Sequence, residues 1–232
     1  MKQGPAARLL AAAETMGVPL SPAQAGELVA LFDRIALEPQ NLTSIEDVDE
    51  AVDRHLADSL AGLTAPEISG PLVDLGSGGG FPGLVLAMLR PEMPVTLVES
   101  EKKKARWLEA ASAALPNVRV VADRSEHLAK DERGAYATVT ARAVAPLVPV
   151  IELAAPFVAE RGHALVWSTP MAPADEARAA EAAGLLGLQA LPVRPVRPFA
   201  DAERVLRVFR RVAPTPPKFP RRPGRAVARP IA

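Results

Sequence analysis

Short apolar segments alternate with amphipathic ones from residue 72 onward, and this alternation predicts a parallel β-sheet with right-handed helical crossovers. The predicted strands share an apolar, β-branched composition and cover residues 72–75, 95–98, 118–121, 135–140, 163–167, 188–193 and 205–211. The predicted helices carry apolar residues at three- and four-residue spacings and cover residues 84–90, 102–114, 125–130, 147–158 and 174–183. The pattern therefore predicts an α/β fold with a seven-stranded sheet whose last two strands form a hairpin.

The first 68 residues have a helical pattern instead. Ser21 and Gln24 form a capping box that predicts a helix to about residue 38, with one apolar stripe. Ser44 and Asp47 predict the start of a second helix that ends near residue 63. His55 lies on the apolar face of this second helix, and we interpret it as an interfacial residue rather than a catalytic one.

These patterns divide the chain into an N-terminal helical extension (1–68), an α/β domain (69–212) and a Pro- and Arg-rich tail (213–232). The formal net charge is zero, but eight basic and no acidic residues lie from Arg207 to Ala232, against 19 basic and 27 acidic residues before them. A basic tail on an acidic body predicts a polyanionic partner. The alternative is a solvated tail with no partner.

Composition narrows the possible chemistry. The 232 residues contain no cysteine, which fits a reducing compartment and excludes thiol nucleophiles, disulfides and Cys-ligated zinc. No apolar run approaches the roughly 20 residues of a membrane helix, and the apolar run 9–13 is too short for a signal peptide. We therefore expect a cytoplasmic protein without membrane contact, and we predict no metal site.

The segment 74–83, Asp-Leu-Gly-Ser-Gly-Gly-Gly-Phe-Pro-Gly, lies between the first predicted strand and the helix after it. Glycines permit positive φ and let a ligand approach the backbone closely, and a helix N-terminus supplies free N–H groups. The pattern Gly78-x-Gly80-x-x-Gly83 matches the dinucleotide fingerprint, which is weak evidence alone. The glycines directly after the strand, Gly76-x-Gly78-x-Gly80, follow the acid Asp74 and resemble the first motif of class I S-adenosyl-L-methionine (AdoMet) methyltransferases. A sulfonium cosubstrate has no pyrophosphate, so an acid beside the loop can receive its methionine amino group.

Four further residues lie at or just after the ends of the second, third and fourth predicted strands, where ligands bind in open α/β sheets. Glu99 ends the second strand, 23 residues after Gly76, the distance at which a carboxylate meets ribose hydroxyls. Ser125 and Glu126 follow the third strand and are placed for the adenine edge. Arg142 follows the fourth strand, where the reacting methyl group and the substrate should meet.

The residues after the fourth strand also restrict the substrate. They lack the Asn/Asp-Pro-Pro-aromatic loop typical of amine methylation, the chain lacks the cysteine needed at pyrimidine C5, and no lysine constellation for ribose O-methylation is evident. A nucleophile that needs no deprotonation remains, such as guanine N7, because alignment and desolvation are enough for its attack. Arg142 then fits as a donor to guanine O6 or to a phosphate, a positioning role.

The motifs occur in a specific order along residues 28–225. They are Asn41-Leu42-Thr43-Ser44, His55-x-x-Asp58-Ser59-Leu60, the segment 74–83, Thr96-Leu97-Val98-Glu99-Ser100, Ala141-Arg142-Ala143-Val144-Ala145 and the ending 216–224. This ordered set resembles the bacterial small-subunit rRNA guanine-N7 methyltransferases, the RsmG family, formerly glucose-inhibited division protein B. One departure is Ser168, where the family usually has a lysine.

The resemblance implies a class I, Rossmann-like AdoMet-methyltransferase fold and methylation of N7 of one guanine in 16S rRNA, free or in the small ribosomal subunit. With Arg142 as the catalytic residue, the implied and predicted cofactor-binding residues are Asp74, Gly76, Gly78, Phe81, Glu99, Ser125, Glu126 and Arg142. We expect a monomer. Two alternatives remain, a small-molecule AdoMet methyltransferase and a non-catalytic module that binds AdoMet or RNA.

Overall fold

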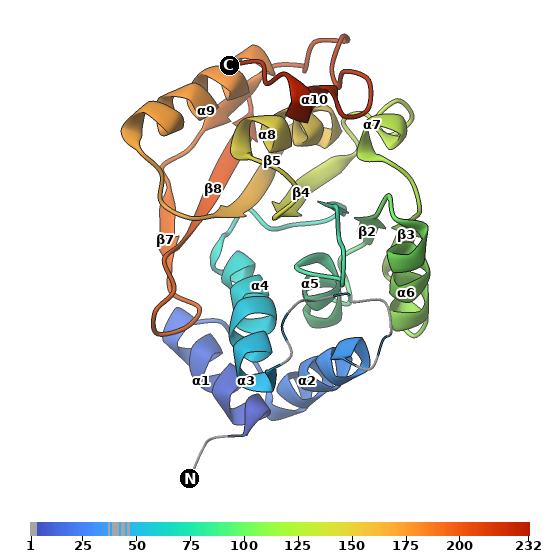
Figure 1. Cartoon of the computed structure of the whole chain (residues 1–232), viewed down its shortest axis with the longest axis vertical. Coiled ribbons are helices and arrows are strands. Elements are labelled where there is room, and N and C mark those ends of the chain that lie inside the picture. The colour runs from blue at the N-terminus through green and yellow to red at the C-terminus, as the bar shows by residue number, and fades with distance from the viewer. Residues whose placement is uncertain (1–3, 37, 39–41, 43–44, 46) are drawn as a thin grey trace.

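A twisted sheet of eight strands forms the middle layer of the protein, and helices cover both of its faces (Figure 1). The computed structural model describes residues 4–36, 38, 42, 45 and 47–232. The strands are β1 (Leu72–Leu75), β2 (Val95–Val98), β3 (Val118–Val121), β4 (Tyr136–Arg142), β5 (Val158–Ser168), β6 (Leu188–Ala190), β7 (Arg194–Val196) and β8 (Arg204–Arg211). Their order is β3-β2-β1-β4-β5-β8-β6, and β7 also pairs with β8.

The first five strands are parallel, and β8 runs antiparallel to β5, so the predicted α/β sheet with a reversed end is confirmed. Of the predicted strand 188–193, only residues 188–190 form a strand, β6, and β7 follows at 194–196 as a strand that the pattern did not predict. Both pair with β8, so the sheet has eight strands and not the predicted seven. Pro192 lies between them, and a proline has no N–H to donate to the ladder. Because β1 to β4 run parallel, their carboxyl ends lie at one edge of the sheet.

Helices before and after β1 cover one face of the sheet. They are α1 (Pro5–Met16), α2 (Pro22–Ala36), α3 (Val48–Ala51), a π-helical segment (Val52–Ala57), α4 (Asp58–Leu60), a 3₁₀ turn (Ala61–Thr64), α5 (Gly83–Leu89) and α6 (Lys102–Ser112). The other face carries α7 (Ser125–Leu128), α8 (Leu147–Ala154), a 3₁₀ turn (Ala155–Phe157), α9 (Pro173–Leu185) and α10 (Arg225–Ala228). Successive strand residues point to opposite faces, so Leu72 packs in the first core and Val73 in the second.

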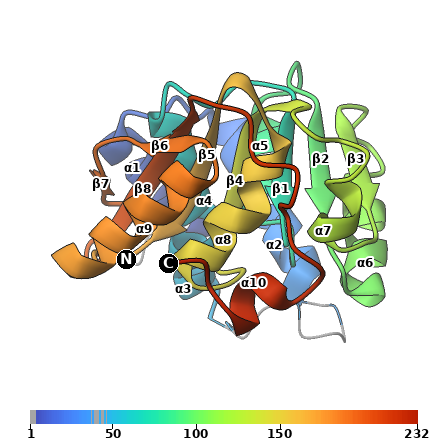
Figure 2. The same cartoon turned by 90° about the horizontal axis from the view of Figure 1, so that it is seen from above.

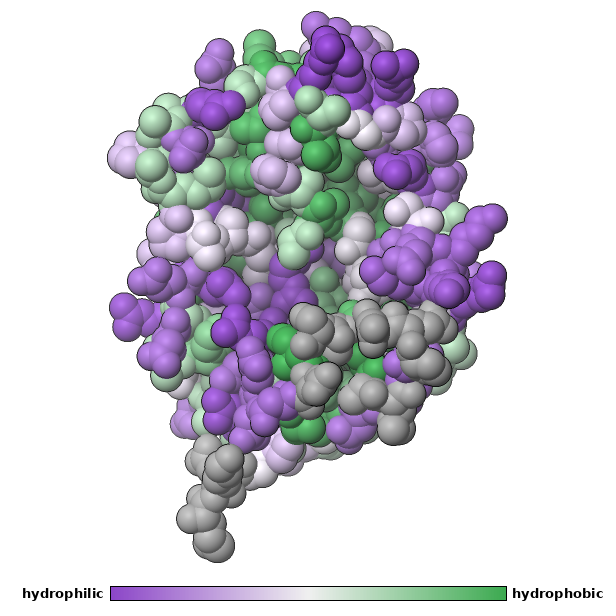
Figure 3. Space-filling model, in the orientation of Figure 1, coloured by the Kyte–Doolittle hydropathy of each residue, from purple (hydrophilic) through white to green (hydrophobic). Residues whose placement is uncertain are grey.

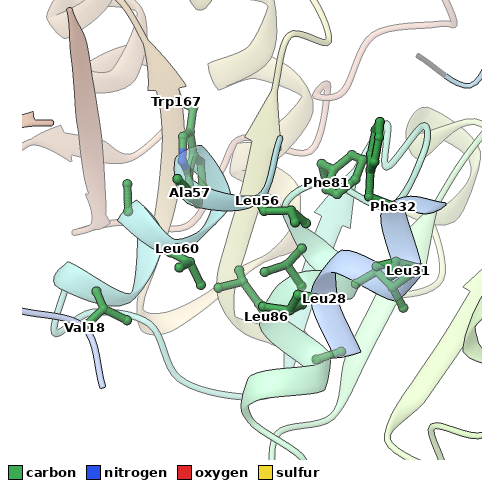
Figure 4. Packing of buried hydrophobic residues seen from close by; sticks show 14 of the residues in the cluster. Val18, Leu28, Leu31, Phe32, Leu56, Ala57, Leu60, Phe81, Leu86 and Trp167 are labelled. Atoms are coloured by element: carbon green, nitrogen blue, oxygen red, sulfur yellow. The ribbon is translucent and has the colours of Figure 1, made fainter. Parts of the chain in front are cut away.

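The N-terminal helices share their core with the sheet. Side chains of α2, including Leu28 and Phe32, pack beside Leu56 and Leu86, and Trp167 of β5 belongs to the same cluster (Figure 4). The predicted capping box is confirmed, because the Ser21 N–H donates to Gln24 Oε1 and the Gln24 N–H donates to Ser21 Oγ. The division of the chain at residue 68 stays a prediction.

The second N-terminal helix changes its winding along its length, from α to π to α to 3₁₀. Asp47 caps it by accepting a hydrogen bond from the Glu50 N–H at 2.8 Å. The predicted cap Ser44 and the residues Asn41 and Thr43 of the first family motif lie outside the described residues. Among the described ranges, none of the helices combines the length and apolarity that a bilayer crossing needs.

The C-terminal segment 213–232 packs against the body of the protein. Figure 2 shows it running past α8 to the short helix α10. Phe219 and Ala226 are buried in the second core, and Arg221 forms an ion pair with the buried Glu152 of α8. A fully solvated tail is therefore wrong, while the predicted contact of this segment with a polyanion stays a prediction.

Candidate active site

The glycine loop joins the end of β1 to the start of α5. Gly76, Gly78 and Gly80 have φ values of +67°, +56° and +105°, a region that side chains other than glycine rarely adopt. The Gly76 N–H donates to the Val98 carbonyl at 2.9 Å, which ties the loop to β2. A Cβ atom at Gly76 would lie 2.8 Å from a methyl carbon of Val144. The loop therefore needs glycine both for its conformation and for its close approach to the segment after β4.

Asp74 lies beneath this loop and is fully buried. Its Oδ1 accepts a hydrogen bond from Thr140 Oγ1 at 2.7 Å, and its Oδ2 accepts one from the Gly83 N–H at 3.2 Å. Burial raises the pKa of Asp74 to about 6, against the opposing effect of these hydrogen bonds. Asp74 thus fastens β1 to β4 and to the start of α5. Its predicted contact with a methionine amino group stays a prediction.

Glu99 lies beside the loop, at the end of β2. Its Oε2 accepts a hydrogen bond from the Gly78 N–H at 3.0 Å, and its Oε1 accepts one from the Glu101 N–H at 2.7 Å. A carboxylate offers about four acceptor positions, so these two bonds leave acceptor capacity for ligand hydroxyls. The structure therefore brings the predicted residues Gly78 and Glu99 together, and the contact of Glu99 with ribose hydroxyls stays a prediction.

A cavity of about 200 Å³ opens at this edge of the sheet. It is lined by the strand ends Leu75, Gly76, Val98 and Ser100, the α7 segment Asp123, Arg124, Ser125 and Glu126, and the residues Val144, Ala145, Leu153, Gly224, Ala226 and Val227. Apolar surface is visible between α8 and the glycine loop in the space-filling view (Figure 3). The predicted residues Gly76, Ser125 and Glu126 thus lie around one cavity.

Arg142 ends β4 next to the loop, and its side chain is 13% exposed. Its Nη1 donates to Asp58 Oδ2 at 2.9 Å and to the Arg54 carbonyl at 2.8 Å. Its guanidinium carbon lies 5.5 Å from the centre of the Phe81 ring, within cation–π range. Two predicted residues, Arg142 and Phe81, are therefore in contact, and the helical extension holds the arginine in place.

His55 completes this cluster. Its ring stacks on Phe81 with centroids 4.7 Å apart and planes 6° from parallel, and its Nδ1 lies 3.3 Å from Arg142 Nη2. Burial, together with the charges of Arg142 and Arg54, lowers the pKa of His55 to about 4. The imidazole is consequently neutral at neutral pH, and its Nδ1 can accept the arginine N–H. This arrangement agrees with the interfacial interpretation of His55.

Comparison with known proteins decides the family. A family model described as rRNA small subunit methyltransferase G matches residues 28–194, which is most of the chain. The chain belongs to the rRNA small subunit methyltransferase G family. The resemblance drawn from the ordered motifs is thereby confirmed.

Relatives in this family cover much of the chain. The ribosomal RNA small subunit methyltransferase G of Sorangium cellulosum is 49% identical over 135 residues, which span 56% of this chain and 56% of the relative. The protein of the same name from Thermotoga neapolitana is 36% identical over 156 residues, with coverages of 66% and 68%. That of Leptothrix cholodnii is 39% identical over 162 residues, with coverages of 66% and 73%.

Solved structures share the fold. A 16S rRNA (adenine(1408)-N(1))-methyltransferase from Catenulisporales acidiphilia has a TM-score of 0.51 at 18% identity, covering 62% of this chain and 88% of that one. A protein from Agrobacterium tumefaciens, described as a predicted O-methyltransferase, has a TM-score of 0.50 at 23% identity, with coverages of 68% and 81%. At these identities the likeness concerns the fold, and it confirms the class I, Rossmann-like architecture.

The structure adds Asp58 to the site of this family member, a residue to which the sequence alone gave no role. Asp58 is 3% exposed. It pairs with Arg142 and lies 3.3 Å from Arg204 Nε, while its carbonyl accepts a hydrogen bond from Trp167 Nε1 at 2.8 Å. The family motif could have indicated this role for Asp58, because His55 and Asp58 are three residues apart and face the same side of a helix.

Ser168, the departure from the usual family lysine, lies at the end of β5. The guanidinium of Arg207 donates to Ser168 Oγ and, at 3.0 Å, to the Thr169 carbonyl. The same side chain pairs with Glu176 and is 3% exposed. Arg207 therefore places its charge inside the protein at this position and does not present it to RNA.

A larger cavity of about 850 Å³ lies between the N-terminal helices and the loop before β8. Charged side chains line most of it, with the acids Asp47, Asp49, Glu50, Asp53, Asp201 and Glu203 and the bases Arg8, Arg54 and Arg204. Acidic side chains outnumber basic ones there, so this cavity does not suit a polyanion. The smaller cavity is the candidate for the cofactor, because Gly76 of the glycine loop lines it.

Proposed function

We propose that this protein transfers the methyl group of AdoMet to N7 of a guanine in 16S rRNA. The observation that carries the proposal is the glycine loop of a chain in the rRNA small subunit methyltransferase G family, facing a cavity lined by Gly76, Ser125 and Glu126. Relatives in the family are named as ribosomal RNA small subunit methyltransferases, which supports an rRNA substrate.

The residues at the cavity fit AdoMet. A Cβ at Gly76 would meet Val144 at 2.8 Å, so only a bare backbone fits there. A cavity of about 200 Å³ suits one part of the cofactor, the base, since whole drug-sized ligands need roughly 300 Å³ or more. We assign the adenine edge to Ser125 and Glu126, the ribose hydroxyls to Glu99 and the methionine part to the glycine loop. When bound, AdoMet supplies an electrophilic methyl group.

Guanine N7 needs little from the protein beyond alignment. Its lone pair lies in the plane of the base, so no proton has to be removed before the attack. Arg142 has five N–H groups, and among the described residues they meet the Arg54 carbonyl, the His55 ring and the Asp58 carboxylate. The remaining N–H groups can donate to guanine O6 or to a phosphate. We assign Arg142 to holding the substrate, with Phe81 and His55 as the stacked surface beside it.

The proposed substrate class also bears on the cellular location and the oligomeric state of the enzyme. We propose that the enzyme works in the cytoplasm, where its rRNA substrate would be, and that one copy of the chain is enough to form the site. We therefore propose a monomer that meets its guanine in free 16S rRNA or in the small ribosomal subunit.

The direct test is methyl transfer from labelled AdoMet to naked 16S rRNA, to small ribosomal subunits and to a mixture of small metabolites. We expect label in one of the two RNA substrates. Label in the metabolites alone would support the small-molecule alternative. AdoMet binding without transfer to any acceptor would support the non-catalytic alternative.

A further inference from the structure

Hydrogen bonds from one arginine to main-chain carbonyls hold the start of the C-terminal segment against the protein. The guanidinium of Arg133 donates to the carbonyls of Thr215, Pro216 and Phe219, at 2.6, 2.9 and 2.6 Å. The Phe219 side chain is 6% exposed and packs in the core above the sheet. The segment therefore begins its course over α8 in a defined position.

A buried ion pair fixes the segment a second time. Glu152 of α8 is 1% exposed, and the Arg221 guanidinium donates two hydrogen bonds to it, Nε to Oε1 at 2.8 Å and Nη2 to Oε2 at 2.6 Å. Arg221 Nη2 also donates to the Arg229 carbonyl at 2.7 Å, which closes the residues between them into a loop. Paired planar contacts of this kind fix orientation as well as position.

The closed loop stands over the cavity at the glycine loop. The Gly224 N–H donates to Glu126 Oε1 at 3.0 Å, and Gly224, Ala226 and Val227 line the cavity. Gly224 has a φ of +77°, which lets the chain turn at this point. Figure 2 shows this part of the chain, with α10, crossing in front of the α8 layer. Val227 is 53% exposed although it borders the cavity.

We infer that residues 221–229 form the outer wall of the adenine pocket and set the affinity of the protein for its cofactor. This inference rests on the proposed function, because adenine is the part of AdoMet assigned to the cavity. Glu126 accepts the Gly224 N–H at Oε1 and, at 3.4 Å, the Ser125 hydroxyl at Oε2. A carboxylate has about four acceptor positions, so Glu126 keeps capacity for a ligand donor such as the adenine amino group. Ala226 and Val227 supply the apolar cover that a base needs on its face.

The inner face of residues 221–229, which is the side that borders the cavity, favours a cofactor over RNA as its ligand. Its cation Arg221 is already paired with Glu152. Its contribution to the cavity consists of a backbone turn and two aliphatic side chains, which suit a flat heterocycle and offer a phosphate nothing.

The first test changes Val227 in the otherwise intact protein. Val227→Asp removes the apolar cover and places a carboxylate near Glu126, so we expect the calorimetric Kd for AdoMet to rise about tenfold. Val212→Asp is the matched control, because Val212 is 58% exposed and does not border the cavity. Equal Kd values for the two variants would overturn the inference. The wild-type titration separates this result from failure of the proposed function, which would show as no AdoMet binding at all.

The second test removes residues 223–232 and keeps both Phe219 and Arg221. We expect the Kd for AdoMet to rise at least about tenfold, while the urea midpoint shows that the protein is still folded. An unchanged Kd would overturn the inference, as would tighter binding, which would make the segment a block on the pocket. Loss of 16S rRNA binding with unchanged AdoMet binding would also overturn it, in favour of an RNA-binding arm.

Discussion

Burial acts in opposite directions on two ionisable residues of the site. It raises the pKa of the Asp74 carboxyl to about 6 and lowers the pKa of the His55 imidazole to about 4. Both shifts favour the neutral form of a group that lies close to Arg142. Among the described residues, the one carboxylate hydrogen-bonded to the Arg142 guanidinium is that of Asp58.

The His55 shift predicts a pH-dependent stability. The folded-state pKa of His55, about 4, lies below the ordinary value of 6.5. The contribution of neutral His55 to the free energy of unfolding is therefore complete above pH 6.5 and is lost as the pH falls toward 4. His55→Gln removes this titration but keeps an acceptor for Arg142. We measure the free energy of unfolding of both proteins in urea. Between pH 7.5 and pH 4.5 the wild type should lose roughly 2 to 3 kcal/mol more than the variant. A constant difference would contradict the assignment.

Arg142 provides the second prediction at this scale. Arg142→Lys keeps the charge but loses the planar donor set, so we expect kcat for methyl transfer to fall roughly 10- to 100-fold. Arg178→Lys is the control, because Arg178 is exposed on α9. A kcat equal to that of the control would show that the guanidinium has no part in the reaction.

At the scale of elements, the site depends on contacts between segments that are far apart in the chain. The loop 74–83, Glu99 and the strand ends were predictable, because they belong to neighbouring βαβ units whose order is fixed by local patterns. Asp58 reaches Arg142 across 84 residues, and Gly224 reaches Glu126 across 98. No local pattern encodes such pairs, since packing of the helical extension and of the C-terminal segment creates them.

The ion pair between Arg221 and Glu152 predicts the cost of releasing the C-terminal segment. Arg221→Gln leaves the 1%-exposed Glu152 carboxylate without its cation, and we expect the free energy of unfolding to fall by about 3 kcal/mol. Arg222→Gln, at the exposed neighbouring position, should change it by less than about 0.5 kcal/mol. The double change Arg221→Gln with Glu152→Gln should recover part of the loss. Equal effects at positions 221 and 222 would contradict the pairing.

At the scale of the whole molecule, the C-terminal segment has two faces. Its inner face borders the cavity, while Lys218, Arg222 and Arg229 are exposed on the outside. The charge asymmetry of the sequence predicts that the outer face contacts a polyanion. Composition alone does not indicate that this C-terminal segment packs over α8. A fixed segment presents its cations next to the site at little cost in conformational entropy.

The outer face predicts a salt effect. Replacing Lys218, Arg222 and Arg229 by Gln should reduce the slope of log K against log salt for 16S rRNA binding by about 2 to 3, because each phosphate contact contributes roughly 0.7 to 0.9. The Kd for AdoMet should stay unchanged, since none of the three borders the cavity. An unchanged slope would retire the RNA contact of this segment.

The identity of the methylated atom tests the proposed function most directly. After reaction with labelled AdoMet, 16S rRNA is digested to nucleosides and the labelled nucleoside is identified by mass spectrometry. We expect 7-methylguanosine from a single position of the RNA. Label in any other nucleoside, or AdoMet binding with no label in RNA, would contradict the assignment of this site to guanine N7.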